Sequence, residues 1–202
     1  MSEVHRRRSK GDLDRCDCLA YSYEDWSLAQ ITQPCFERNR ELYLGKSAQR
    51  LDVLILRDPF NLFASRLKQG FIATKAKRMS MVAMWLQYAK EFVGESNYLT
   101  NHLVCISYNR WFVDASYRAQ LAEHLGLTFS DLGREKVCGM GGGSSFDGTD
   151  FSGRAAEMNV LNRWQKLADV PAFRQLFENE AVWHYSHQIF GELPGTARLR
   201  DH

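Results

Sequence analysis

Two short aliphatic runs are the strongest hydrophobic features along the chain. Residues Leu51 to Leu56 (LDVLIL) and Leu103 to Ser107 (LVCIS) carry almost only apolar side chains. Such continuous runs are typical of strands that are covered on both faces in a parallel sheet. A shorter apolar segment, Cys18 to Tyr23, predicts a further strand that ends at Glu24.

Helical spacing of apolar residues accounts for much of the remaining chain. A stripe with i, i+3, i+4 spacing runs through residues 79–93, and a second one begins at Val113 and is stopped by Gly126. Pro59 suits the first turn of a helix that follows the first aliphatic run. Further helices are predicted at about 26–44, 61–68, 153–168 and 171–190, with a glycine-rich loop over 127–152. Strands that alternate with helices predict an α/β fold with a parallel sheet flanked by helices.

Length and composition are those of a globular protein. The 202 residues fit one domain, and 45% hydrophobic with 25% charged residues argues against a disordered, collagen-like or coiled-coil chain. The polar, basic residues 1–12 predict a flexible tail, which leaves 13–202 as the folded domain. A formal net charge of +2 gives no reason to expect a nucleic-acid partner.

Nothing in the sequence predicts a membrane segment or a metal site. The apolar runs are too short to span a bilayer, and no apolar segment follows the basic stretch at residues 5–8, so a cytoplasmic protein is expected. The five cysteines include a lone C-x-C at Cys16 and Cys18 but no paired C-x-x-C or Cys/His cluster, so no metal is expected.

The junction between the first aliphatic run and the next helix is the first candidate site. Ligands of open parallel sheets bind outside the carboxyl ends of the strands, where a helix N-terminus favours an anion. Arg57 stands at this end and can fork two hydrogen bonds onto a phosphate, and the hydroxyl of Ser65 follows eight residues later. The alternative is that Arg57 pairs with an acidic neighbour and that Ser65 is an ordinary surface residue.

A glycine-rich stretch is the second candidate site. Consecutive glycines let a backbone approach a ligand and aim successive N–H groups at it, and an aromatic ring beside them can stack on a base. The alternative is a flexible surface loop. The candidate residues are Gly141, Gly142, Gly143, Ser144, Ser145 and Phe146.

The order of these segments resembles a known family. Leu51–Leu67, with Arg57-Asp58-Pro59 and Ser65, is similar to the 3′-phosphate motif of sulfotransferases that use 3′-phosphoadenosine 5′-phosphosulfate (PAPS). The resemblance covers about two thirds of the chain. It continues through the helix of Trp85, Leu103–Tyr108, Leu121–Leu127, the glycine loop and Asn162-Arg163-Trp164.

The resemblance implies a sulfotransferase-like fold, related to the P-loop proteins, in which Arg57 and Ser65 hold the 3′-phosphate of PAPS. The loop at 141–146 then stands where the family places later nucleotide contacts, without the family's Arg-Lys-Gly triplet. The implied reaction moves a sulfuryl group from PAPS to a hydroxyl or amine of a small molecule, sugar or lipid.

One part of the family pattern is missing from the sequence. The lysine-bearing loop for the 5′-phosphosulfate is not found, because Gly45-Lys46-Ser47 precedes its strand and has Arg40 where a Walker-type loop needs glycine. The chain is therefore expected to be an N-terminally truncated enzyme, or a non-catalytic relative that binds nucleotides or partners. Glu24 is the candidate general base, with a carboxylate that favours a helix N-terminus as its alternative role.

Overall fold

The structure is a computed structural model, and it describes residues 20–44, 49–139 and 142–200. Within these ranges no helix is long and apolar enough to cross a bilayer. The last third of the chain contains short 3-10 helices, which are η2 (Ala155–Glu157), η3 (Arg163–Leu167), η4 (Gln175–Phe177) and η5 (Thr196–Leu199). The helices and strands are α2 (Leu28–Ile31), α3 (Pro34–Leu44), β1 (Asp52–Leu56), α4 (Pro59–Lys68), α5 (Lys75–Phe92), β2 (Leu103–Ser107), α6 (Tyr108–Val113), α7 (Ala115–His124), α8 (Pro171–Arg174) and α9 (Glu180–Phe190).

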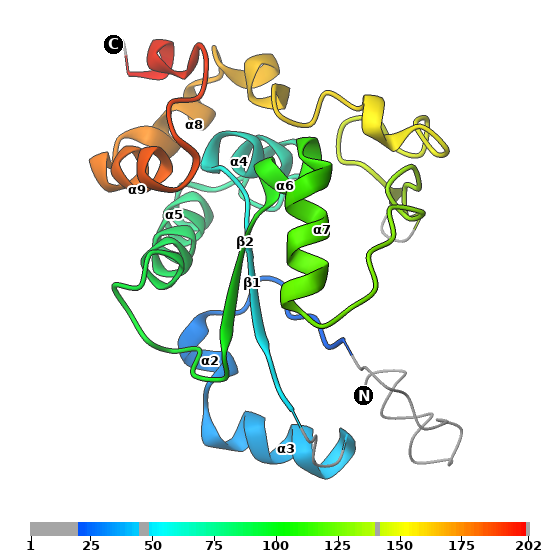
Figure 1. Cartoon of the computed structure of the whole chain (residues 1–202). Helices are drawn as coiled ribbons and strands as arrows, with labels where there is room; N and C mark the ends of the chain where they lie inside the picture. The colour runs from blue at the N-terminus through cyan, green and yellow to red at the C-terminus, as the bar shows by residue number, and fades with distance from the viewer. Residues whose placement is uncertain (1–19, 45–48, 140–141, 201–202) are drawn as a thin grey trace.

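The fold is α/β, with a small parallel sheet between helices. β1 pairs with β2 in parallel, with Asp52 opposite Leu103 and Leu56 opposite Ser107. Figure 1 shows α5 on one side of the two strands and α7 on the other. The predicted α/β class and both predicted aliphatic strands are confirmed.

β1 is covered on only one face, so the expectation that both faces are buried is wrong for this strand. Leu54 and Leu56 are buried, whereas Val53 and Ile55 are 44% and 61% exposed. Paired residues of parallel strands share a face, and Val104, opposite Val53, is buried. The cover on this face therefore lies over β2 and does not reach β1.

Several predicted helices are shorter than expected. The predicted helix at 26–44 is divided into α2 and α3 just before Pro34, and the stretch from Val113 is divided at Asp114, whose side chain accepts from the N–H of Tyr117 and caps α7. The helix predicted for 171–190 is divided into α8, η4 and α9. Of the predicted strand at 18–23, residues 20–23 form no strand, and Cys18 and Leu19 lie outside the described residues.

The prediction of a helix at 153–168 is wrong, because a side chain of α4 forms hydrogen bonds with backbone groups of this segment. Asn61 donates from its side-chain amide to the carbonyl of Leu161 and accepts from the N–H of Trp164. These groups are then not free for helical hydrogen bonds. The segment instead contains the short turns η2 and η3, and its Trp164 enters the core.

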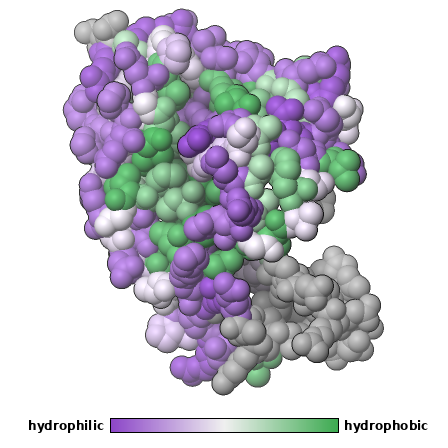
Figure 2. Space-filling view, viewed as in Figure 1, coloured by the Kyte–Doolittle hydropathy of each residue, from purple (hydrophilic) through white to green (hydrophobic). Residues whose placement is uncertain are grey.

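The core is built around α4 and is rich in aromatic rings. Phe60 stacks on Phe177 with ring centroids 4.9 Å apart, and Phe63 meets Trp85 edge-on. Aromatic pairs of this kind add to the free energy gained from area burial. In Figure 2, hydrophobic residues gather over α5 and beside the strands, with hydrophilic residues around them. This packing fixes α4, and with it the residues at its start.

We expect Leu54→Ala to lower the free energy of unfolding by about 2–5 kcal/mol, because it removes a buried side chain. Ile55→Thr is expected to change it by less than about 0.5 kcal/mol, because Ile55 is exposed and threonine keeps the β-branched shape. Urea denaturation of the two variants measures both values. An equally large loss for Ile55→Thr would mean that β1 is covered on both faces in solution.

Candidate functional site

The N-terminus of α4 is closed by its own carboxylate. Asp58 is fully buried, and its side chain accepts hydrogen bonds from the N–H of Asn61 (2.8 Å) and from the Asn61 amide (3.0 Å). One of the backbone N–H groups that this helix end is expected to offer an anion is therefore already taken by Asp58.

Arg57 leaves the end of β1 without a carboxylate partner in the described part of the chain. Its Nη2 donates to the carbonyl of Val160 (2.7 Å), its guanidinium lies over the ring of Tyr108 at 5.1 Å, and its buried Nε has no partner. The indole N–H of Trp85 donates to the Arg57 carbonyl (3.0 Å) and fixes the backbone there. The alternative role for Arg57, an ion pair with an acidic neighbour, is not found among these residues.

Burial acts on both charges at this junction in opposite directions. It lowers the pKa of the Arg57 guanidinium, while the neighbouring Asp58 and Tyr108 raise it. It raises the pKa of the Asp58 carboxyl, against the lowering effect of the hydrogen bonds from Asn61 and of the charge of Arg57. Arg57 therefore carries a partly buried positive charge that Asp58 and Tyr108 offset in part.

Ser65 meets the glycine-rich loop. Its hydroxyl lies 2.7 Å from the hydroxyl of Ser145. Arg57 instead contacts Val160, beyond this loop, and Asn61, one helical turn before Ser65, holds the adjacent Leu161. The structure thus brings the two candidate segments, 57–65 and 142–146, together on one side of α4.

The glycines of the loop serve a tight turn. Gly143 has φ +79°, and a Cβ there would lie 2.4 Å from the carbonyl oxygen of Gly148. Ser144 and Gly148 exchange two backbone hydrogen bonds, and the Ser144 hydroxyl accepts the N–H groups of Phe146 (3.3 Å) and Asp147 (3.2 Å). The loop amides therefore point at its own serine, so the predicted open cradle for an anion is closed. Gly141 lies outside the described residues.

Arg163 is a member of this cluster to which sequence reasoning assigned no role. Its guanidinium is buried and donates to the Ser144 hydroxyl (2.7 Å) and to the Asp147 carboxylate (2.6 Å). The ring of Phe146 contacts two cations, with the Arg163 guanidinium at 5.5 Å and the Lys166 ammonium at 5.4 Å. The spacing of Arg163 and Lys166 in the sequence is the only signal that could have indicated them.

Glu24 is not brought to this cluster. It is exposed, and no hydrogen bond or ion pair joins it to another described residue. Its neighbour Asp25 pairs with Arg66 (2.7 Å). Nor does Glu24 lie in the first turn of α2, which is capped by Ser27 with Gln30.

Two hollows in the described residues lie away from the candidate cluster. One lies between α5 and η4 and the other beside residues 91–103, and neither is lined by Arg57, Ser65 or the loop. A bound phosphate would thus have to replace Val160 and Ser145 as partners of Arg57 and Ser65. No group of His, Cys, Asp or Glu side chains suited to a metal ion occurs in the described ranges.

Comparisons with models of known families, with curated proteins and with solved structures found no match to this chain. The sulfotransferase resemblance therefore stays a prediction from the residues. The geometry adds that the two candidate segments meet at Ser65 and Ser145.

We expect Asp58→Asn to change how stability depends on pH. Burial raises the pKa of the Asp58 carboxyl in the native state. Between the ordinary pKa of about 3.9 and this raised pKa, the native state therefore binds more protons than the unfolded chain. The free energy of unfolding consequently falls as the pH rises through that window. Asparagine can accept the same backbone hydrogen bond but does not titrate. The variant should therefore gain stability relative to the natural chain as pH rises.

Urea denaturation in steps from pH 4 to 7 measures this difference. Asp25→Asn, which alters an exposed carboxylate, is the matched control and should show no such gain. A difference between Asp58→Asn and the natural chain that stays constant with pH would contradict the raised pKa.

Proposed function

We propose that this chain binds the adenosine 3′,5′-bisphosphate part of PAPS and is a sulfotransferase-like, P-loop-related domain that transfers the sulfuryl group to a hydroxyl or amine. Two lines support the proposal. The sequence resemblance to the 3′-phosphate motif supplies the chemical class of the ligand. The unpaired Nε–H of Arg57 at the end of β1 supports its assignment to the 3′-phosphate.

The observation that carries the proposal is the unpaired Nε–H of the Arg57 guanidinium. Nη2 has the carbonyl of Val160 as its partner, and Nε is buried with none in the described residues. A buried donor without an acceptor is costly, and a guanidinium offers paired donors that match a phosphate. A phosphate at this place would supply the missing acceptor.

Two neighbouring side chains could give a nucleotide phosphate further hydrogen bonds or positive charge. The Ser65 hydroxyl, once released from Ser145, is a donor on the same side of α4. Lys166 is exposed, and its ammonium lies beside Phe146, so it offers a second cation. Arg163 is already paired with Asp147, so we infer that it stabilises the glycine-rich loop and does not bind phosphate.

Transfer requires more than this binding site. The acceptor oxygen or nitrogen forms a bond to sulfur while the bond from sulfur to the bridging phosphate oxygen breaks, adenosine 3′,5′-bisphosphate leaves, and a base takes the acceptor proton. Glu24, the predicted base, is exposed and contacts none of the other candidate residues. This observation favours the second candidate function, a nucleotide-binding domain without transfer activity.

Calorimetric titration with adenosine 3′,5′-bisphosphate tests the binding. We expect Arg57→Ala to weaken it by about 1.5–3 kcal/mol, or roughly 10- to 150-fold, because a charged hydrogen bond is lost. Arg110→Ala, an exposed arginine of α6 that pairs with Asp114, should leave the affinity unchanged. Adenosine 5′-monophosphate, which lacks the 3′-phosphate, should bind weakly and equally to the natural chain and to Arg57→Ala.

Absence of binding to the natural chain would overturn both candidate functions. If the bisphosphate binds, incubation with PAPS and a panel of hydroxyl and amine acceptors decides between them. Release of bisphosphate together with a sulfated acceptor supports the enzyme, and binding without turnover supports the non-catalytic domain.

A further inference from the structure

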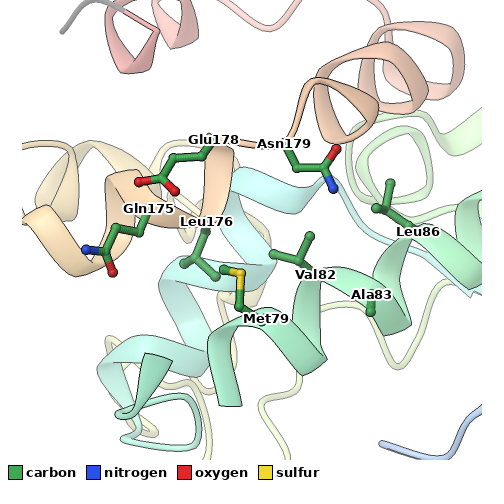
Figure 3. Close-up of a pocket in the computed structure, with 8 residues that line it drawn as sticks. All are labelled: Met79, Val82, Ala83, Leu86, Gln175, Leu176, Glu178 and Asn179. Atoms are coloured by element: carbon green, nitrogen blue, oxygen red, sulfur yellow. The ribbon is translucent and has the colours of Figure 1, made fainter. Parts of the chain in front are cut away.

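A groove on the opposite side of α4 from the glycine loop forms a second hollow in the described residues. It encloses about 330 Å³ between α5 and the turn that joins η4 to α9. One wall is Met79, Val82, Ala83 and Leu86 of α5, and the other consists of Leu176 with three polar residues, Gln175, Glu178 and Asn179. Figure 3 shows Glu178 and Gln175 at one end of the groove and Leu86 and Asn179 at the other.

This groove is distinct from the proposed nucleotide site. None of its lining residues belongs to the cluster of Arg57, Ser65 and the loop. In Figure 1, α5 and α9 lie on one side of α4 and the segment that follows α7 lies on the other. The proposal below therefore does not rest on the proposed function.

The polar side chains at the rim differ in whether their oxygen atoms already accept hydrogen bonds. The Gln175 side-chain oxygen accepts from Arg78 (2.8 Å), and the Asn179 side-chain oxygen accepts from the N–H of Ala181 (3.0 Å). The carboxylate of Glu178 is exposed and has no hydrogen bond or ion pair among the described residues. The one unengaged acceptor at the rim is therefore a negative charge, set beside an apolar floor.

We propose that this groove binds a small organic amine, with its ammonium group at Glu178 and an unbranched apolar body along Met79, Val82 and Leu86. An apolar hollow of about 150 Å³ can hold benzene, so the groove has room for an aryl ring together with an alkyl chain. Its apolar lining and single charged group are what small-molecule sites commonly combine. An anionic ligand would be repelled by the Glu178 carboxylate.

Titration with 4-phenylbutylamine, followed by the NMR signal of the Met79 methyl group, tests the proposal. The Met79 signal should move with ligand concentration, while that of Met84, on the same helix but outside the groove, should not. We expect the amine to bind about three- to fivefold more tightly than 4-phenylbutanol, since an exposed ion pair contributes modestly. The carboxylate 4-phenylbutyrate should bind more weakly than the alcohol.

Variants separate the charge from the groove itself. Glu178→Gln should reduce amine binding to the level of the alcohol, and Glu180→Gln, whose carboxylate pairs with Arg200 outside the groove, should not. Ala83→Phe, at an exposed position of α5, should fill the groove and abolish binding of both ligands. An unmoved Met79 signal, equal affinity for amine and alcohol, or an unaffected Ala83→Phe variant would each overturn the proposal.

Discussion

The hydrogen-bonded pair of Asp58 and Asn61 connects the parts of the structure that surround the candidate site. The backbone N–H of Asp58 donates to the side chain of Asn109, just after β2, and its carboxylate caps α4 through Asn61. Asn61 in turn binds the backbone at Leu161 and Trp164. The side chains of Asp58, Asn61 and Asn109 thus join both strand ends, the central helix and the C-terminal segment. They do so in the interior, where an unpaired polar group would be costly.

This arrangement decides which groups can meet an anion. A helix N-terminus that follows a parallel strand is ordinarily a good place for phosphate, but here the Asp58 carboxylate already accepts the N–H of Asn61. The positive charge available at the strand end is consequently the side chain of Arg57. The glycine loop, which closes on its own Ser144, likewise contributes side chains rather than backbone donors.

Helices and strands that have a clear hydrophobic pattern within a few residues could be predicted from the sequence. Places where contacts between distant residues change the structure that such a pattern favours could not. The aliphatic runs of β1 and β2 and the stripe of α5 carry their pattern within a few residues. The segment around Trp164 has a helical pattern as well, yet Asn61, about a hundred residues earlier, binds its backbone. The exposure of Ile55 was also beyond prediction, because it depends on how far the cover over β2 extends.

The candidate site shows the same division. Arg57, Ser65 and the loop could be singled out from residue type and spacing, and Ser65 does contact the loop at Ser145. Spacing along the sequence does not reveal side-chain positions. It therefore could not show that Asp58 caps α4 or that Arg163 forms an ion pair with Asp147. Glu24 was chosen because it closes a predicted strand, and residues 20–23 form none.

The NMR signal of the Arg57 Nε–H group, which is buried and without a partner in this structure, tests the account most directly. Added adenosine 3′,5′-bisphosphate should shift this signal strongly, and adenosine 5′-monophosphate should leave it in place. Saturating bisphosphate binding with an unmoved Nε–H signal, or equal shifts with both nucleotides, would contradict the assignment of Arg57 to the 3′-phosphate.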